Sequence, residues 1–413
     1  KTVKRLTHAL AYDAPDGAIC LDEVKEVMIM PKFNRQAAAI AVGEKPPDVT
    51  VPPKIASDLR DYIELIACSY NDNPFHNFDH ACHVTMSVSK LIKRIVVPDF
   101  GSDQWEEATR DDGTNKDLAS HLHDFSHGIV SDPMTVFAIV FSALIHDADH
   151  RGVSNTQLCK EEPKMGRKYR EKSVAEQNSL DLAWEALMLD QFRDLRQYIF
   201  GTQEEFLRFR QLIVNVVLAT DIFDKELNDL RKMRWSHAFA EEDSGALACH
   251  APGASVKDFR ATVVMEHIIQ ASDVSHTMQH WHIYRKWNAR LFREMYLAYK
   301  AGRMGADPST FWYKGELGFF DNYVIPLAKK LEECNVFGVS SHEYLNYAMM
   351  NRAEWEERGQ ELMQELMQEV SVTSDADGTT DDVTEVPSSS GAPKSSEESQ
   401  QCNGSNDVLA AQQ

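Results

Sequence analysis

The chain has 413 residues, of which 43% are hydrophobic, enough to build one large domain or two ordinary ones. Its formal net charge of −21 argues against a nucleic-acid-binding surface, because phosphate backbones require clustered lysine and arginine. The seven cysteines are scattered, odd in number and form no CxxC pair. This pattern indicates neither a disulfide framework nor a thiolate zinc site, and it favours a reducing compartment.

The first 50 residues contain Gly43, Pro46 and Pro47, and we predict that they form an N-terminal extension docked on a compact body. The sequence starts at Lys1 without a signal peptide, so we expect a piece of a longer protein that is fused to further domains. The longest apolar run, Met134–Ile145, is too short to span a bilayer. We therefore expect a cytoplasmic segment without membrane contact of its own, or the cytosolic part of a larger membrane protein.

Residues 51–370 show the hydrophobic spacing of helices, with apolar side chains recurring every three to four positions. No alternating strand pattern of comparable length appears. The sequence therefore predicts an all-α fold, a compact multi-helix bundle whose side chains converge on an internal cleft. The predicted helices cover Ile55–Ser69, Val84–Val96, Met134–Ile145, Val174–Leu189, Phe206–Leu218, Phe259–Ala271, His282–Lys300, Phe319–Cys334 and His342–Leu366.

A polar insertion at Pro98–Asp132 interrupts this pattern and carries three histidines, His121, His123 and His127. No partner motif for them occurs elsewhere, so we predict a solvated loop with a short amphipathic turn rather than a metal site.

Two further segments lack the helical pattern. Residues 240–253 are flexible by composition, with EEDSG and APG. Residues 371–413 are rich in Ser, Thr, Asp and Glu, and eight acids against one lysine give this tail a charge of −7. Such a composition predicts disorder.

The residues that suggest chemistry are HNFDH at 76–80, HDADH at 146–150 and SD at 272–273. An isolated HxxxH pair is more often a surface feature, although its histidines share one helix face. In contrast, FSALIHDADH runs from an apolar helix directly into two histidines and two aspartates. Buried groups of this kind need partners or a metal ion, and Asp273, at the end of the apolar MEHIIQASD, needs one as well.

Together, His80, His146, Asp147 and Asp273 could provide four nitrogen and oxygen ligands with no thiolate. This ligand set is typical of a hydrolytic metal centre, whereas structural zinc sites are usually rich in cysteine. Asp147 could bridge to a second, harder ion, and two ions about 3.5 to 4 Å apart would polarise a water and bind phosphoryl oxygens. The pattern therefore indicates phosphoester hydrolysis at a binuclear metal site.

The sequence resembles the catalytic domain of class I cyclic-nucleotide phosphodiesterases, within the wider HD hydrolase group. The resemblance extends from Ala56 to Glu365, where HNxxH, HDxDHxGxSN, SVxE, LATD, SDxSH and LGFFDxxVxPL follow one another in the family's order. It implies Zn²⁺ at the first site, Mg²⁺ or Mn²⁺ at the second, and a cyclic 3′,5′-nucleotide as substrate. Hydroxide bridging the two metals would attack phosphorus, and the product would be the nucleoside 5′-monophosphate.

The resemblance also assigns roles to individual residues. It implies that His80, His146, Asp147 and Asp273 hold the zinc. His150, Glu176 and Thr220 would bind the waters of the second ion, and His76 would be the general acid that protonates the O3′ leaving group. Glu294 would orient and charge His76, although its sequence surroundings alone predict a solvated helix residue.

For the base, the resemblance implies that Phe319 stacks on the purine and Leu291 closes the opposite face. Asn155 and Asp221 match positions that line the cleft. His276 matches a second specificity position, where histidine is compatible with dual use. Without the resemblance, Leu291 and Phe319 would be interpreted as core residues.

Glu316 stands where the family carries a purine-reading glutamine. An ionised glutamate only accepts hydrogen bonds, which suits the two-donor edge of guanine better than adenine and favours cGMP. A protonated glutamate would mimic glutamine and restore dual cAMP and cGMP specificity.

Two other functions remain open at this stage. An HD phosphohydrolase acting on another phosphoester would share the metals but not the clamp of Phe319 and Leu291. A catalytically weak regulatory module would bind cyclic nucleotide and signal to fused domains. Homodimers occur in the family, but no interface can be identified from the sequence.

Overall fold

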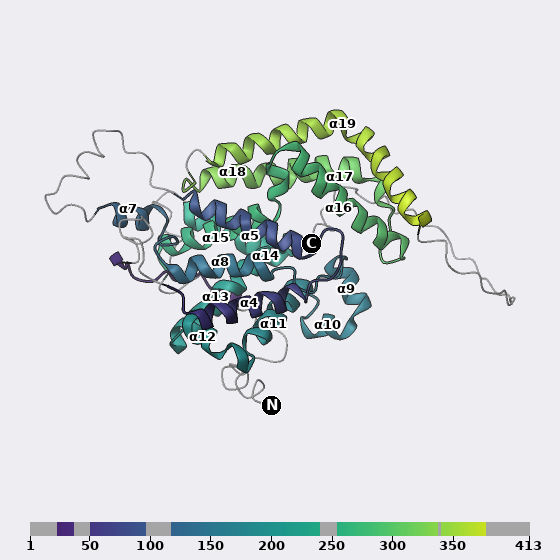
Figure 1. The fold of residues 1–413 in the computed structure, drawn as a ribbon. Helices are drawn as coiled ribbons and strands as arrows, with labels where there is room; N and C mark the ends of the chain where they lie inside the picture. The colour runs from purple at the N-terminus through teal and green to yellow at the C-terminus, as the bar shows by residue number, and fades with distance from the viewer. Residues whose placement is uncertain (1–22, 37–49, 96–116, 240–253, 338–339, 377–413) are drawn as a thin grey trace.

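The computed structural model describes residues 23–36, 50–95, 117–239, 254–337 and 340–376 (Figure 1). These residues form helices and no β-strand, so the predicted all-α fold is confirmed. The helices are α4 (Pro53–Ala67), α5 (Phe78–Lys93), α7 (Asp117–Phe125), α8 (Pro133–Ile145), α9 (Asn155–Glu161), α10 (Pro163–Lys168), α11 (Val174–Leu187), η1 (Asp190–Phe192), α12 (Arg193–Ile199), α13 (Gln203–Leu218), α14 (Lys225–Phe239), α15 (Val256–Asp273), η2 (Ser275–Met278), α16 (Trp281–Lys300), η3 (Pro308–Thr310), α17 (Trp312–Phe319), η4 (Phe320–Val324), α18 (Ile325–Glu333) and α19 (Ser340–Ala376).

Helices α5, α8, α13 and α15 pack against one another in the middle of the bundle (Figure 1). Helices α16 to α19 cover one side of this centre, and α4, α11 and α12 cover the other. Helix α8 is apolar around much of its circumference because α5, α11, α13 and α15 all contact it. This arrangement brings the ends of α5, α8 and α15 to the interior of the molecule.

Helix α5 begins at Phe78, six residues before the predicted start at Val84. Asn77 caps it, because its side-chain oxygen accepts a hydrogen bond of 3.1 Å from the backbone N–H of His80. The apolar periodicity begins only where the helix faces the core. Phe78, Asp79 and His80 of the HNFDH motif therefore form the first turn of α5, whereas His76 lies in the bend before it and does not share a helix face with His80.

The predicted helix Phe319–Cys334 is the second half of a longer helical stretch that starts at Trp312. A π-helical turn, Phe320–Val324, separates α17 from α18, and Pro326 follows it in the first turn of α18. Proline has no N–H to donate, so the hydrogen-bond register changes where it enters the helix.

The segment at residues 98–132 was predicted to be a solvated loop with a short amphipathic turn. Its second half instead contains helix α7. Leu122 and His123 are buried there, and His123 Nδ1 lies 2.6 Å from the hydroxyl of Ser131. Among the described residues, no group of three or more metal-ligand side chains includes His121, His123 or His127. His123 therefore belongs to the local packing of α7, whereas His121 is exposed.

The described part of the N-terminal extension docks on α14 and α15. Arg234 is fully buried, pairs with Glu266, and donates to the carbonyl oxygens of Val24 and Glu26. At the other end of the chain, α19 continues to Ala376, past the boundary predicted at residue 370. The predicted loop at 240–253 and the tail from residue 377 lie outside the described residues.

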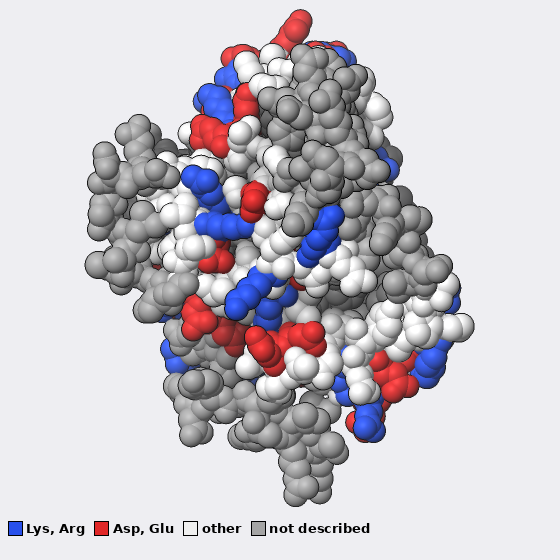
Figure 2. Space-filling view, turned by 90° about the vertical axis from the view of Figure 1, so that its left-hand side faces the viewer, with Lys and Arg blue, Asp and Glu red and all other residues white. Residues whose placement is uncertain are grey.

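The surface of one face is shown in Figure 2, where basic side chains are interspersed with acidic ones. Within the part of the chain that the structure describes, no helix combines the length and the apolar character needed to cross a bilayer.

Candidate metal centre and catalytic site

The four predicted metal ligands converge from the ends of three helices. His80 lies in the first turn of α5, His146 and Asp147 follow α8 directly, and Asp273 is the last residue of α15. One ligand atom from each side chain can be chosen so that all four lie within 4.8 Å of one another. The packing of α5, α8 and α15 therefore assembles a set of ligands that are almost 200 residues apart in the sequence.

The distances show nitrogen and oxygen atoms facing a common point. His80 Nε2 lies 2.9 Å from Asp273 Oδ1 and 3.7 Å from Asp147 Oδ2. His146 Nε2 lies 3.1 Å from Asp147 Oδ2 and 3.3 Å from Asp273 Oδ1. Both imidazoles are 1% exposed and the carboxylates are 14% and 18% exposed, so the carboxylates form the open side of the site.

The residues fit a bound dication. His146 Nδ1 donates to the carbonyl oxygen of Ala143 at 3.0 Å, which leaves Nε2 as the nitrogen available to a metal. This Nε2 is buried and faces the carboxylate oxygens of Asp147 and Asp273. Burial lowers the pKa of His146, but Asp147 and Asp273 raise it well above its usual value. The two carboxylates thus favour a positive charge at His146 Nε2, where a cation would bind. Neutral imidazoles together with carboxylates are a typical set of zinc ligands.

A second cluster joins His76, His150 and Glu294. His76 Nδ1 lies 2.5 Å from Glu294 Oε1, and Glu294 Oε2 accepts hydrogen bonds from the backbone N–H groups of Phe75 (2.8 Å) and His76 (3.0 Å). His76 Nε2 is buried and has no hydrogen-bond partner. Glu294 is 5% exposed, so it is not the solvated helix residue that its local sequence suggests. The pair presents Nε2 as the nitrogen that can exchange a proton with a ligand.

Electrostatics keep this pair ionised. Burial lowers the pKa of His76, but the carboxylate of Glu294 raises it to about 9 overall. Burial raises the pKa of Glu294, but the charge of His76 lowers it to about 2 overall. The ring of His76 lies 4.0 Å from that of His150 and 6.1 Å from that of His80, measured between centroids. A protonated imidazole is therefore favoured beside the predicted metal ligands at neutral pH.

The residues predicted to surround a second ion lie on an adjacent wall. Burial, and then the charges of Asp221 and Asp147, raise the pKa of Glu176 to about 8. Glu176 Oε2 accepts a hydrogen bond of 3.1 Å from Asn155 Nδ2. Thr220 directly precedes Asp221, and its hydroxyl donates to the carbonyl oxygen of Val217 at 2.8 Å. The wall therefore contains buried carboxylates that a cation would stabilise.

Glu316 is buried at the centre of a polar network on α16 and α17. The hydroxyl of Tyr284 donates to Glu316 Oε2 at 2.6 Å, and Trp312 Nε1 donates to Asn288 Oδ1 at 3.3 Å. Burial raises the pKa of Glu316 to about 7, although the hydrogen bonds from Tyr284 and Asn288 oppose this shift. The protonated and ionised forms of this carboxyl group therefore interconvert closer to neutral pH than those of an exposed glutamate.

Phe319, Leu291 and His276, which were also predicted to contact the base, are buried, whereas Asn155 is half-buried. Phe319, Leu291 and His276 are 0%, 1% and 3% exposed, and the ring of Phe319 stacks on that of Tyr323 with a centroid separation of 5.4 Å. Leu291 and Phe319 belong to the main hydrophobic cluster, which is what their sequence alone suggests. The clamp around a purine remains a prediction.

Sequence reasoning missed Tyr284 and Asn288. Both face the interior from α16, at positions i and i+4, in line with Leu291 and Glu294. One signal could have identified them: both are polar residues on the apolar face of a helix that also carries predicted site residues.

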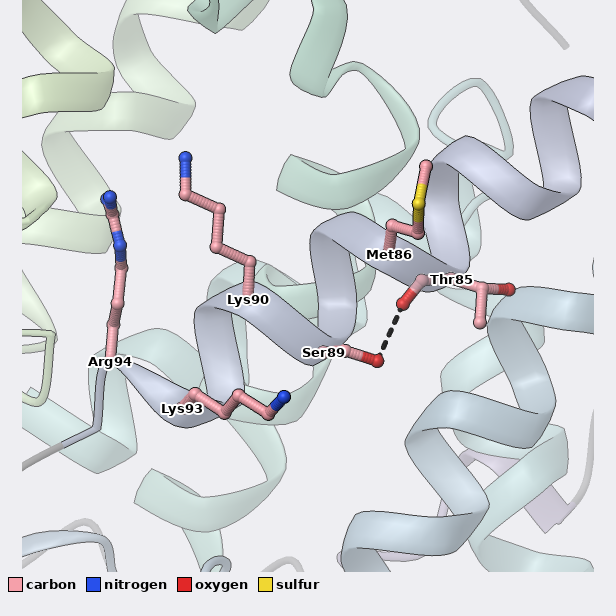
Figure 3. A pocket seen from close by; sticks show the side chains of 6 residues that line it. All are labelled: Thr85, Met86, Ser89, Lys90, Lys93 and Arg94. Carbon is pink, nitrogen blue, oxygen red and sulfur yellow. Dashed lines mark hydrogen bonds between the residues drawn. The ribbon is translucent and has the colours of Figure 1, made fainter.

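A surface hollow of about 560 Å³ lies on the outer face of α5 (Figure 3). Thr85, Met86, Ser89, Lys90, Lys93 and Arg94 line it. None of them belongs to the predicted site, and Arg94 pairs with Glu343 of α19. This hollow is therefore separate from the metal centre, although both involve α5.

Comparison with known proteins agrees with this geometry. The family model of the 3′5′-cyclic nucleotide phosphodiesterase matches residues 75–341. The dual specificity calcium/calmodulin-dependent 3′,5′-cyclic nucleotide phosphodiesterase 1C of Mus musculus is 24% identical over 280 residues, which cover 65% of this chain and 33% of that protein. The probable 3′,5′-cyclic-AMP phosphodiesterase pde-4 of Caenorhabditis elegans is 25% identical over 66% of this chain and 36% of its own length.

Among solved structures, the phosphodiesterase domain of Salpingoeca rosetta rhodopsin phosphodiesterase has the same fold. It superposes with a TM-score of 0.53 at 21% identity, over 89% of this chain and 97% of that one. The chain belongs to the 3′5′-cyclic nucleotide phosphodiesterase family, and the family resemblance of the sequence is confirmed. It spans about a third of the length of the curated relatives that it matches.

The His76–Glu294 pair predicts a pH-dependent contribution to stability. The pKa of His76 is about 9 in the folded protein and about 6.5 in the unfolded chain. The ion pair therefore contributes its full stabilisation below about pH 6.5, and this stabilisation is lost as the pH rises through 9. Glu294→Gln should therefore lower the free energy of unfolding by on the order of 3 kcal/mol near pH 6 and by far less at pH 10. Urea unfolding of both proteins in the same metal state, at several pH values, measures this difference.

Glu365→Gln is the matched control, because Glu365 is 54% exposed and pairs with Arg285 on the surface. Its effect should be small at every pH. A destabilisation by Glu294→Gln that stays constant from pH 6 to pH 10 would contradict the assigned charge state of His76.

Proposed function

We propose that this chain hydrolyses the 3′ phosphoester bond of a cyclic 3′,5′-nucleotide to give the nucleoside 5′-monophosphate. The observation that carries the proposal is a complete set of metal ligands with a protonated imidazole beside it, the His76 ring lying 6.1 Å from the ring of His80. The relatives of Mus musculus and Caenorhabditis elegans are named as cyclic-nucleotide phosphodiesterases, which supports the same substrate class.

In this proposal His80, His146, Asp147 and Asp273 hold Zn²⁺, and Asp147 also reaches a second ion, Mg²⁺ or Mn²⁺. When bound, the two ions supply an activated water and neutralise charge on the phosphoryl oxygens. His150, Glu176 and Thr220 would hold water molecules of the second ion by hydrogen bonds. All three side chains are buried and polar, which suits this role.

His76 is the proposed general acid. Its Nδ1 proton is held by Glu294, so Nε2 carries the proton that can pass to the O3′ atom as the phosphoester bond breaks. The backbone N–H groups of Phe75 and His76 hold Glu294 in place, which fixes the direction of the ring.

For the base we propose recognition by Glu316, with Phe319 and Leu291 as the clamp. His276, Asn155 and Asp221 would line the rest of the cleft. Tyr284 donates to Glu316 Oε2, and a hydrogen bond from Asn288 also acts on this carboxyl group, so a purine would share the carboxyl group with both residues. In its ionised form the carboxylate would accept from guanine N1–H and the exocyclic amine, which favours cGMP, and in its protonated form it could also donate and allow dual use.

The domain of Salpingoeca rosetta comes from a rhodopsin phosphodiesterase, also described as a RhoPDE fusion protein. By analogy we propose that this chain is the cytosolic part of a larger membrane protein and is fused to further domains. A homodimer is also compatible with the proposal. Residues 51–370 would form the catalytic domain, between the extension at 1–50 and the tail at 371–413.

Turnover tests the central proposal. With zinc and magnesium present, the wild type should convert cAMP or cGMP to the 5′-monophosphate. His76→Ala should lower kcat by about 100- to 10,000-fold, because general acid catalysis is lost. Asp273→Ala should abolish turnover, because it removes a ligand. Product analysis by chromatography checks both results.

Lys232→Ala is the control, since Lys232 is a surface residue with a side chain 74% exposed. Full activity in His76→Ala or Asp273→Ala would remove the role assigned to that residue. Binding of cyclic nucleotide without any turnover by the wild type would contradict the enzyme and indicate a regulatory module.

The protonation state of Glu316 can be tested through the preference of the enzyme for cGMP over cAMP. The ratio of kcat/KM for cGMP to that for cAMP should rise by up to about tenfold between pH 6 and pH 8, as Glu316 ionises near pH 7. Glu316→Gln should give a ratio that does not depend on pH. The ratio cancels the titration of His76, which affects both substrates alike. A ratio that is equal and flat in both proteins would refute this account of base recognition.

A further inference from the structure

The loop before α11 has an unusual backbone for its sequence. Arg170, Glu171 and Ser173 all have positive φ angles, of 56°, 58° and 41°, although none of them is glycine. Left-handed conformations are costly for residues with a Cβ atom, and they persist only where surrounding contacts compensate for the strain. Such contacts are present here: Gln177 Nε2 donates to the carbonyl of Lys172 at 2.7 Å, and Glu171 N–H donates to the carbonyl of Gly166 at 2.8 Å.

Ser173 occupies the N-cap position of α11 but does not cap the helix with its side chain. Serine is among the preferred N-cap residues because its hydroxyl usually accepts a hydrogen bond from the first turn. In this chain Asn155 performs that task, since its Oδ1 accepts from the backbone N–H of Ala175 at 2.8 Å. The hydroxyl of Ser173 is therefore available for another contact.

That contact is with Asp221. The Ser173 hydroxyl donates to Asp221 Oδ2 at 2.6 Å, and both residues are 2% exposed. The other oxygen, Oδ1, accepts from the backbone N–H groups of Phe223 (2.9 Å) and Asp224 (2.8 Å). Asp221 thus ties the start of α11 to the turn between α13 and α14.

The two tied segments carry the residues proposed for the second ion. Glu176 is in the first turn of α11, three residues after Ser173, and Thr220 directly precedes Asp221. Arg231 fixes the turn from its other side by donating to the carbonyl oxygen of Asp221 at 2.7 Å. A change at Ser173 would therefore alter the distance between the two walls of the proposed site without removing any group that faces the ion.

We infer that Ser173 is a positioning residue for the second cation: by holding Asp221, it keeps Glu176 and Thr220 at the spacing that the hydrated ion requires. The strained backbone is the cost of directing the hydroxyl towards Asp221 instead of towards α11. This inference rests on the proposed function, because it assigns Ser173 to an ion that the function requires.

The test uses the full chain loaded with zinc and titrated with Mn²⁺, whose binding is measured by electron paramagnetic resonance. Ser173→Gly and Ser173→Ala should both weaken Mn²⁺ binding by about tenfold, a typical effect of losing an outer contact of a metal site. Ser173→Gly should also have a higher Tm than Ser173→Ala, because glycine adopts positive φ without strain. Ser173→Thr keeps the hydroxyl and should bind Mn²⁺ like the wild type, even if its Tm falls.

Ser255→Ala is the matched control. Ser255 also donates its hydroxyl to a carboxylate at 2.6 Å, that of Asp258, but at the opposite end of α15 from Asp273. This variant should lose stability without losing Mn²⁺ affinity.

The possible outcomes distinguish a failure of the role of Ser173 from a failure of the proposed function. Wild-type affinity in Ser173→Gly, or tenfold weaker binding in Ser255→Ala, would overturn the role of Ser173 and leave the proposed function intact. An absence of Mn²⁺ binding by the wild type would overturn both this inference and the second ion of the proposed function.

Discussion

The structure depends on the meeting of two half-buried carboxylates and two buried imidazoles where α5 begins and where α8 and α15 end. Asp147 and Asp273 each lie within 4 Å of His80 Nε2 and His146 Nε2, and His146 has already used its other nitrogen for a backbone carbonyl. Nitrogen lone pairs and carboxylate oxygens at these distances need a positive charge between them. A divalent cation satisfies this requirement and compensates for the desolvation of both carboxylates.

Ionisable side chains that surround these four residues have strongly shifted pKa values. Glu294 stabilises the positive charge of His76. Burial and the charges of Asp221 and Asp147 raise the pKa of Glu176 to about 8, so a bound cation would favour the ionised form of this carboxyl group. A buried acid pair and buried carboxyl groups thus accompany the four predicted ligands. Further away, burial raises the pKa of Glu316 to about 7.

The sequence predicted much of this arrangement, because the relevant signals are local. A carboxylate or histidine at the end of an apolar run, as at Ile145 to Asp147, identifies a buried polar group before any fold is known. The helices with clear apolar spacing, such as Val174–Leu187 and Trp281–Lys300, were predicted to within a few residues. The family motifs indicated which of these residues come together as metal ligands.

The rest could not be predicted, because it depends on contacts between distant segments. Helix α14 has few periodic apolar residues and is held by Arg234, whose partners are 32 and more residues away. Helix α7 lies in a stretch that is polar enough to resemble a loop, yet it buries Leu122 and His123. The contact between Ser173 and Asp221 joins residues 48 positions apart, and no local pattern indicates it.

The most direct test of the central claim is the metal content and coordination of the purified chain after incubation with zinc and exhaustive dialysis. Elemental analysis and zinc X-ray absorption should find one tightly held ion per chain, with nitrogen and oxygen ligands at about 2.0 to 2.2 Å and no sulfur. The absence of a stoichiometric ion, or sulfur in its coordination shell, would contradict the account.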